Sequence, residues 1–211
     1  MPPYFPQAHK YACSLATLRS VLAVQGVAVS EEKLVAKVQQ DYGKNFKNLW
    51  NPTIAKLACE YGIDTKMYAL WPLFKLENLA ATIEKIERNP AHMDVRKYEN
   101  PDDKDTLGEP LPLAYKEVFK AIKNGCKVTY GGLTEGRIIR ILGRGHYIQT
   151  SIKINLLYPD DRASFHSILL YKCKEGIVTY HDPARYAAME CEVEKLLRAA
   201  NGAGAFMEYT L

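Results

Sequence analysis

The segment Cys13-Ser14-Leu15-Ala16-Thr17-Leu18-Arg19-Ser20-Val21-Leu22 is the most informative part of the sequence. Its apolar residues recur with the three- and four-residue spacing of an amphipathic helix, which predicts a helix over 12–24 with Cys13 near its start. A thiol at the N-terminus of a helix lies at the positive end of the helix dipole, where its pKa is lowered. The segment therefore predicts both a packed helix and a reactive cysteine.

Two polar residues lie far downstream in apolar runs that have the composition of β-strands. His166 lies inside one run, and Asp182 follows the next, with a short glycine-containing turn between the runs. This pattern predicts a β-hairpin in which the two side chains are neighbours across the strands. A carboxylate orients an imidazole, and the imidazole lowers the pKa of a nearby thiol. We therefore expect Cys13, His166 and Asp182 to form a nucleophile, its base and the group that orients the base.

Gln7 lies six residues before Cys13, in a loop that leads into the predicted helix. Its side-chain amide and the backbone N–H of Cys13 would together donate hydrogen bonds to the oxyanion of a tetrahedral intermediate. Taken singly, Gln7 is a polar loop residue and Cys13 a buried helix cysteine, and the histidine–aspartate pair is a structural hydrogen bond. The combination of all four residues favours a cysteine hydrolase.

The length and composition of the chain are those of a globular protein. The 211 residues are 47% hydrophobic and 25% charged, which predicts one well-packed domain over 1–211. The net charge of +4 is small and evenly spread, so no nucleic-acid partner is expected. No apolar run approaches the ~18 residues that a membrane helix needs, and the first residues lack the basic region and apolar core of a signal peptide. No membrane partner is expected.

The cysteines do not have the spacing of a metal site. They are scattered singly along the chain: Cys13, Cys59, Cys126, Cys173 and Cys191. Such cysteines are typical of a reducing compartment, so the sequence predicts a cytoplasmic protein without a metal or another cofactor. His181 directly precedes Asp182, and alternation along a strand predicts that it points away from the site.

The order of the predicted elements indicates the fold class. Helices are predicted at 12–24, 30–40, 51–62, 76–88, 114–124, 134–142 and 190–200, and strands at 63–70, 127–130, 146–158, 165–173, 177–181 and 205–210. Residues 89–113 are rich in proline and aspartate and are predicted to be a solvated insertion. Helices first and strands later predict an α+β fold in which N-terminal helices pack on a C-terminal antiparallel sheet.

The motifs around the candidate residues resemble those of a known family. His166 lies in Phe-His-Ser-Ile-Leu-Leu-Tyr and Asp182 in His-Asp-Pro-Ala. Together with Gln7 and Cys13, these motifs are similar to those of the papain-like cysteine peptidases. The resemblance is closest to the bacteriocin-leader (double-glycine) peptidases and their free-standing relatives, in which a strand histidine is followed sixteen residues later by an Asp-Pro pair, as here.

The resemblance implies a papain-like fold and hydrolysis of a peptide or isopeptide bond through an acyl-enzyme on Cys13, with a peptide or protein substrate. His166 would act as general base and then general acid, Asp182 would orient it, and Gln7 would donate to the oxyanion. The family often has glycine after the nucleophile, whereas this chain has Ser14. Two alternatives use the same residues: a papain-like acyltransferase or transpeptidase, as phytochelatin synthase is, and a non-catalytic peptide-binding relative.

Overall fold

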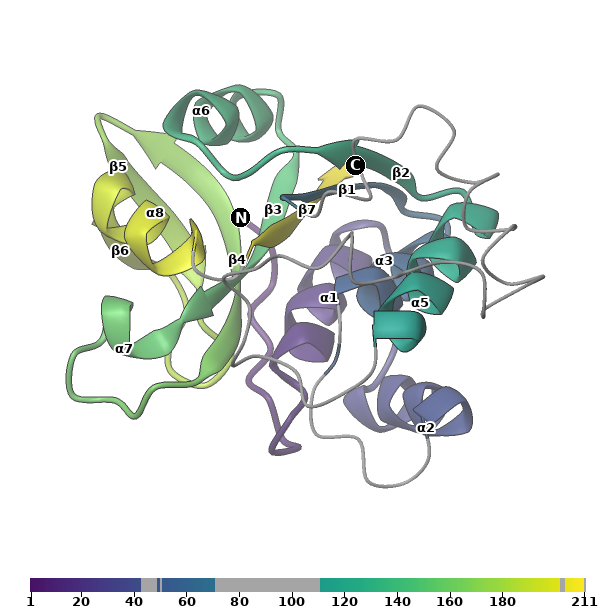
Figure 1. Ribbon diagram of the computed structural model, residues 1–211. Coiled ribbons are helices and arrows are strands. Elements are labelled where there is room, and N and C mark those ends of the chain that lie inside the picture. Colours follow the sequence, from purple (N-terminus) through teal and green to yellow (C-terminus); the bar gives the residue numbers. More distant parts are fainter. Residues whose placement is uncertain (43–48, 50, 71–110, 202–203, 211) are drawn as a thin grey trace.

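The computed structural model describes residues 1–42, 49, 51–70, 111–201 and 204–210 (Figure 1). Its helices are α1 (Cys13–Val24), α2 (Glu31–Tyr42), α3 (Asn51–Glu60), α5 (Leu111–Lys123), α6 (Glu135–Gly143), α7 (Ile154–Leu157) and α8 (Val193–Asn201). Its strands are β1 (Asp64–Ala69), β2 (Lys127–Tyr130), β3 (Tyr147–Lys153), β4 (Phe165–Lys174), β5 (Ile177–His181), β6 (Met189–Glu192) and β7 (Ala205–Thr210). The helix predicted at 76–88 lies outside the described residues.

The strands of the described residues form a seven-stranded sheet in the order β2-β1-β7-β3-β4-β5-β6. Neighbouring strands are antiparallel, except that β1 and β2 are parallel. Figure 1 shows α1, α3 and α5 against one face of the sheet and α6 and α8 against the other. Alternate residues of β4 enter the two cores, because Leu169 packs with the α1 side and Ile168 with the α6 and α8 side. The predicted α+β class is confirmed.

Two elements of the C-terminal half differ from the prediction. The strand predicted at 146–158 ends at Lys153, after its last pair with β4, and the chain then turns into α7. The helix predicted at 190–200 begins only at Val193, because the residues before it pair with β5 as the edge strand β6. Side chains along β6 alternate between half-buried and exposed, as in a strand, although its two glutamates favour helices. Strand pairing overrides local preference here.

The start of α5 also corrects the predicted boundaries. This helix begins at Leu111, three residues before the predicted start and inside the insertion predicted at 89–113. Pro112 is compatible with this start, because a proline in the first turn removes no intrahelical hydrogen bond. The rest of the predicted insertion lies outside the described residues, and a single domain over 1–211 stays a prediction.

The β4–β5 hairpin brings His166 and Asp182 to the same end of the sheet. Its two-residue turn is Glu175-Gly176, and both residues have positive φ, at 51° and 76°. This is the conformation of a type I′ turn, whose twist matches that of the paired strands. The register pairs Leu169 with His181, and its continuation places Asp182 diagonally across from His166.

The helix α1 supplies a clear test of the core. Leu18 is fully buried, whereas Val24 at the end of the same helix is 38% exposed. We expect Leu18→Ala to lower the free energy of unfolding by about 2–5 kcal/mol, because it leaves a cavity. Val24→Ala is the matched control and should cost less than about 1 kcal/mol. Denaturant unfolding measures both, and equal costs would contradict the packing of α1 against the sheet.

Candidate active site

Cys13 is the first residue of α1 and is half-buried. The residue before it, Ala12, makes no side-chain hydrogen bond to the free N–H groups of the helix, and the first turn contains no acidic residue. No side chain of this turn therefore compensates the positive end of the helix dipole beside the thiol. This arrangement favours the thiolate form of Cys13.

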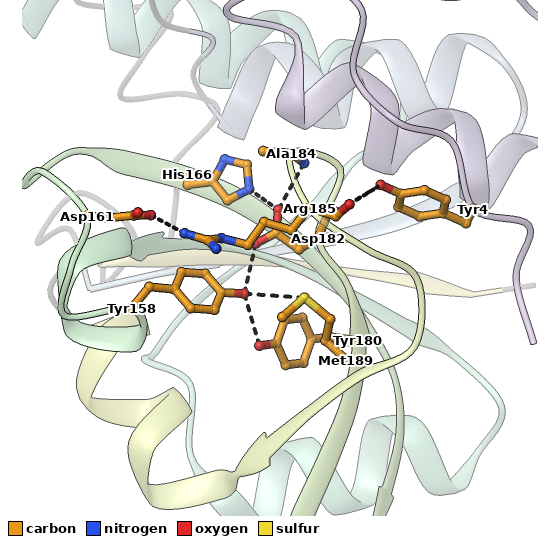
Figure 2. A network of polar contacts seen from close by, with 9 residues as sticks. All are labelled: Tyr4, Tyr158, Asp161, His166, Tyr180, Asp182, Ala184, Arg185 and Met189. Carbon is orange, nitrogen blue, oxygen red and sulfur yellow. Dashed lines mark hydrogen bonds and ion pairs between the residues drawn. The ribbon is translucent and has the colours of Figure 1, made fainter.

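His166 and Asp182 form a buried pair (Figure 2). Nε2 of His166 lies 2.6 Å from Oδ1 of Asp182, and the two residues are 7% and 0% exposed. Since an ionised carboxylate only accepts hydrogen bonds, Nε2 carries the donated proton. The other ring nitrogen, Nδ1, is left for Cys13, whose thiol hydrogen-bonds to this imidazole. The fold thus brings together three residues from the two ends of the chain.

The pKa values of Cys13 and His166 shift in opposite directions. Burial raises the pKa of Cys13, but the hydrogen bond and charge of His166, with the backbone of Ser167, outweigh burial and leave this pKa lowered. Burial lowers the pKa of His166, but the hydrogen bonds to Asp182 and Cys13 outweigh it and raise this pKa to about 9. Both shifts favour a thiolate beside an imidazolium.

Asp182 is a buried carboxylate with a hydrogen-bond donor at each oxygen. Besides His166, Oδ1 accepts from the backbone N–H of Ala184 at 2.9 Å, and Oδ2 accepts from the hydroxyl of Tyr158 at 2.9 Å. Burial raises the pKa of Asp182, but the hydrogen bond and charge of His166, together with the other two donors, outweigh burial and lower this pKa. The carboxylate therefore stays ionised and stabilises a positive imidazole.

The N-terminal segment brings Gln7 to the loop that carries Asp182. The backbone N–H of Gln7 donates to the carbonyl of Pro183 at 2.9 Å. The hydroxyl of Tyr4 donates to the carbonyls of Asp182 and Arg185 at 3.3 and 3.2 Å. Oε1 of Gln7 is buried and has no hydrogen-bond partner among the described residues. The group of Gln7 that lacks a partner is therefore a hydrogen-bond acceptor.

Two other histidines have partners of their own. Nε2 of His181 donates to the carbonyl of Pro2 at 2.9 Å, and its Nδ1 accepts from the backbone N–H of Ala188 at 3.1 Å. His181 therefore points to the N-terminal segment, as alternation along the strand predicts. His146 pairs with Glu208 at 2.8 Å.

A buried network that the sequence analysis missed supports the first turn of α1. Nε2 of Gln149 donates to the carbonyl of Ser14 at 3.3 Å and to Oγ of Ser167 at 3.0 Å. Its Oε1 accepts from the hydroxyl of Tyr209 at 2.8 Å, and both Gln149 and Tyr209 are fully buried. The network ties the backbone next to Cys13 to the sheet. A glutamine within a strand-forming run was the signal that could have revealed it.

A cavity of about 410 Å³ opens beside the loop that follows Asp182. It is lined by Ile154, Asp161, Ala184, Arg185 and Tyr186. Pockets that combine apolar walls with a few charged groups are typical places for a ligand. The backbone of Ala184 bonds to Asp182, so the cavity adjoins the buried pair.

Within the described part of the chain, no group of three histidine, cysteine, aspartate or glutamate side chains is placed to hold a metal ion. No helix formed by these residues combines the length and the apolar character needed to cross a membrane.

Comparisons with known proteins identify the fold. No protein-family model and no curated protein sequence matches the chain. Among solved structures, it is similar to a protein of Bacillus anthracis described as a "putative C39-like peptidase", with a TM-score of 0.54 and 11% sequence identity. The match covers 99% of this chain and 94% of that protein. The likeness shows that the two share a fold, and the predicted papain-like architecture is thereby confirmed.

The buried pair yields a prediction that needs no substrate. We expect Asp182→Asn to lower the pKa of His166 by at least about one unit from about 9, because the carboxylate charge is lost while burial remains and only the contacts with Cys13 still raise this pKa. An NMR titration of the imidazole measures this change. Asp64→Asn is the matched control, since it makes the same change at an exposed carboxylate that pairs with Lys127 at 2.9 Å. An unchanged pKa in Asp182→Asn would contradict the pairing.

Proposed function

We propose that this protein is a cysteine peptidase that hydrolyses a peptide or isopeptide bond through an acyl-enzyme on Cys13. The observation that carries the proposal is the hydrogen-bonded series from the thiol of Cys13 through His166 to the buried Asp182. A thiolate at a helix start beside an oriented imidazole is the arrangement that nucleophilic catalysis by cysteine requires. The fold shared with the "putative C39-like peptidase" supports a peptide or protein as substrate.

The chemistry has two steps. The thiolate of Cys13 attacks the carbonyl carbon and forms a C–S bond, and the resulting oxyanion collapses as His166 passes its proton to the leaving amine and the C–N bond breaks. The neutral imidazole then takes a proton from water, which attacks the thioester, and the C–S bond breaks to restore the thiolate and the imidazolium. Asp182 keeps the ring oriented and stabilises its charge in both steps.

The oxyanion needs donors at the start of α1. The backbone N–H of Cys13 lies in the first turn and therefore has no intrahelical partner. Gln7 is anchored at the loop that carries Asp182, and we propose that its amide supplies the second donor.

Loss of one such donor in other enzymes costs about 10²–10³ in kcat. We expect a loss of this size in Gln7→Ala, with KM changed little, measured by steady-state kinetics on a cleaved peptide.

Selective modification of Cys13 tests the proposal before a substrate is known. We expect a vinyl-sulfone or epoxide probe to modify Cys13 alone, as seen by mass spectrometry, and His166→Ala to suppress this reaction. Cys59 is the demanding internal control, because a hydrogen bond from Cys126 lowers the pKa of Cys59 to about 7 although no imidazole is part of that pair. Equal labelling of all five cysteines would refute a catalytic role for Cys13.

The pKa shifts also predict the pH dependence of hydrolysis. Activity requires the thiolate of Cys13 and the imidazolium of His166 together. The rate should therefore rise with pH through the lowered pKa of Cys13 and fall as pH passes about 9, where His166 loses its proton. A kcat/KM profile against pH measures both limbs. A rate that keeps increasing above pH 9 would contradict the role of His166 as general acid.

Isotope labelling distinguishes hydrolysis from acyl transfer. In water enriched with oxygen-18, a peptidase places the label in the carboxylate of its product, because water accepts the acyl group. A transferase would form an amide or thioester with an added acceptor and incorporate little label. If the protein instead binds peptides without catalysis, alkylation of Cys13 by iodoacetamide should follow a thiol pKa near 8.5.

A further inference from the structure

Tyr158 occupies a central position in the polar network around Asp182 (Figure 2). It directly follows α7, and its backbone N–H donates to the carbonyl of Ile154 at 2.8 Å. Its hydroxyl lies 2.9 Å from Oδ2 of Asp182, 3.0 Å from the hydroxyl of Tyr180 and 3.7 Å from Sδ of Met189. The phenol therefore holds the carboxylate oxygen that His166 does not use.

The direction of these hydrogen bonds follows from proton counting. An ionised Asp182 can only accept, so the single hydroxyl proton of Tyr158 is donated to Oδ2. The hydroxyl of Tyr180 must then donate to the oxygen of Tyr158. The hydrogen bonds therefore run from Tyr180 to Tyr158 and from Tyr158 to Asp182. The first of these bonds polarises the Tyr158 hydroxyl and strengthens the second. Burial and these contacts raise the pKa of Tyr158, so it stays protonated and remains a donor.

Arg185 competes for the same carboxylate oxygen. Its Nε lies 4.0 Å from Oδ2 of Asp182, while its NH2 group is held by Asp161 at 2.6 Å. The guanidinium also stacks 3.9 Å above the ring centre of Tyr158. With the Tyr158 hydroxyl in place, Oδ2 is already occupied by a neutral donor. Without it, the guanidinium of Arg185 would attract Oδ2 and turn the carboxylate away from its alignment with His166.

We propose that Tyr158 is a positioning residue, which fixes the carboxylate plane of Asp182 so that Oδ1 remains aligned with His166. This inference rests on the proposed function, and it adds a group that acts through Asp182 without touching the substrate. The hydroxyl of Tyr158 secures Oδ2, the backbone N–H of Ala184 secures Oδ1, and the two together leave the carboxylate one orientation.

Tyr158→Phe tests the inference, with Tyr180→Phe as the matched control. Each variant removes one phenol hydroxyl from the same series of hydrogen bonds, but only Tyr158→Phe removes a donor to Asp182. In Tyr158→Phe we expect the pKa of His166, measured by NMR, to fall by about one unit or more from about 9, as the carboxylate turns away. The midpoint of the pH profile for iodoacetamide alkylation of Cys13 should rise by a similar amount. Tyr180→Phe should shift the pKa of His166 and the midpoint of the Cys13 alkylation profile by less than about a third of the shifts in Tyr158→Phe.

The outcomes separate this inference from the proposed function. A His166 titration in Tyr158→Phe that equals that of the wild type, or an equal change in Tyr180→Phe, overturns the positioning role. If iodoacetamide reacts with Cys13 of the wild-type protein with the pH dependence of an ordinary thiol, the proposed function fails. The NMR titration of His166 still decides the role of Tyr158 in that case. Thermal melting of both variants identifies any general loss of structure, and conservation of the ring keeps the stacked Arg185 in place.

Discussion

A buried negative charge is the constraint on which the site depends. Asp182 is completely inaccessible to solvent, and a carboxylate in such a place is stable only when its hydrogen-bonding capacity is met. Three donors from different parts of the backbone bond to this carboxylate: His166, Ala184 and Tyr158. The hairpin register, the loop after β5 and the end of α7 must therefore all be formed before the charge is satisfied. The geometry at His166 is a consequence of that requirement.

The other half of the site comes from the opposite end of the chain. Cys13 lies on α1, which belongs to the N-terminal helical layer, and the Gln149 network fastens the first turn of that helix to β3 and β4. The segment before α1 is paired to the loop after Asp182 through Gln7 and Tyr4. The thiol and the imidazole thus meet only when the two layers are docked. Cooperative folding, and no local motif, brings the thiol of Cys13 to the imidazole of His166.

Local patterns in the sequence identified much of this arrangement. The spacing of Leu15, Leu18 and Leu22 was enough to find α1, and the apolar run with its Glu175-Gly176 turn was enough to find the β4–β5 hairpin. The residues that were missed are those whose role is set by long-range contacts. Tyr158 lay at the end of a predicted strand, and its bond to Asp182 depends on where β3 stops, which periodicity does not encode. Gln149 and Tyr4 were missed for the same reason.

The energetics of the buried pair bear on the choice between a catalytic and a structural role. A buried ion pair contributes little to stability, because the cost of removing both charges from water offsets their attraction, and apolar residues of similar size often stabilise a protein more. The pair of His166 and Asp182 therefore contributes little to the stability of the fold. Apolar side chains buried on both faces of the same sheet already stabilise it. An imidazole that is held positive beside a thiol at a helix start has a chemical use that a structural hydrogen bond lacks. This asymmetry between small structural benefit and specific chemical consequence is the strongest physical argument for a nucleophilic role of Cys13.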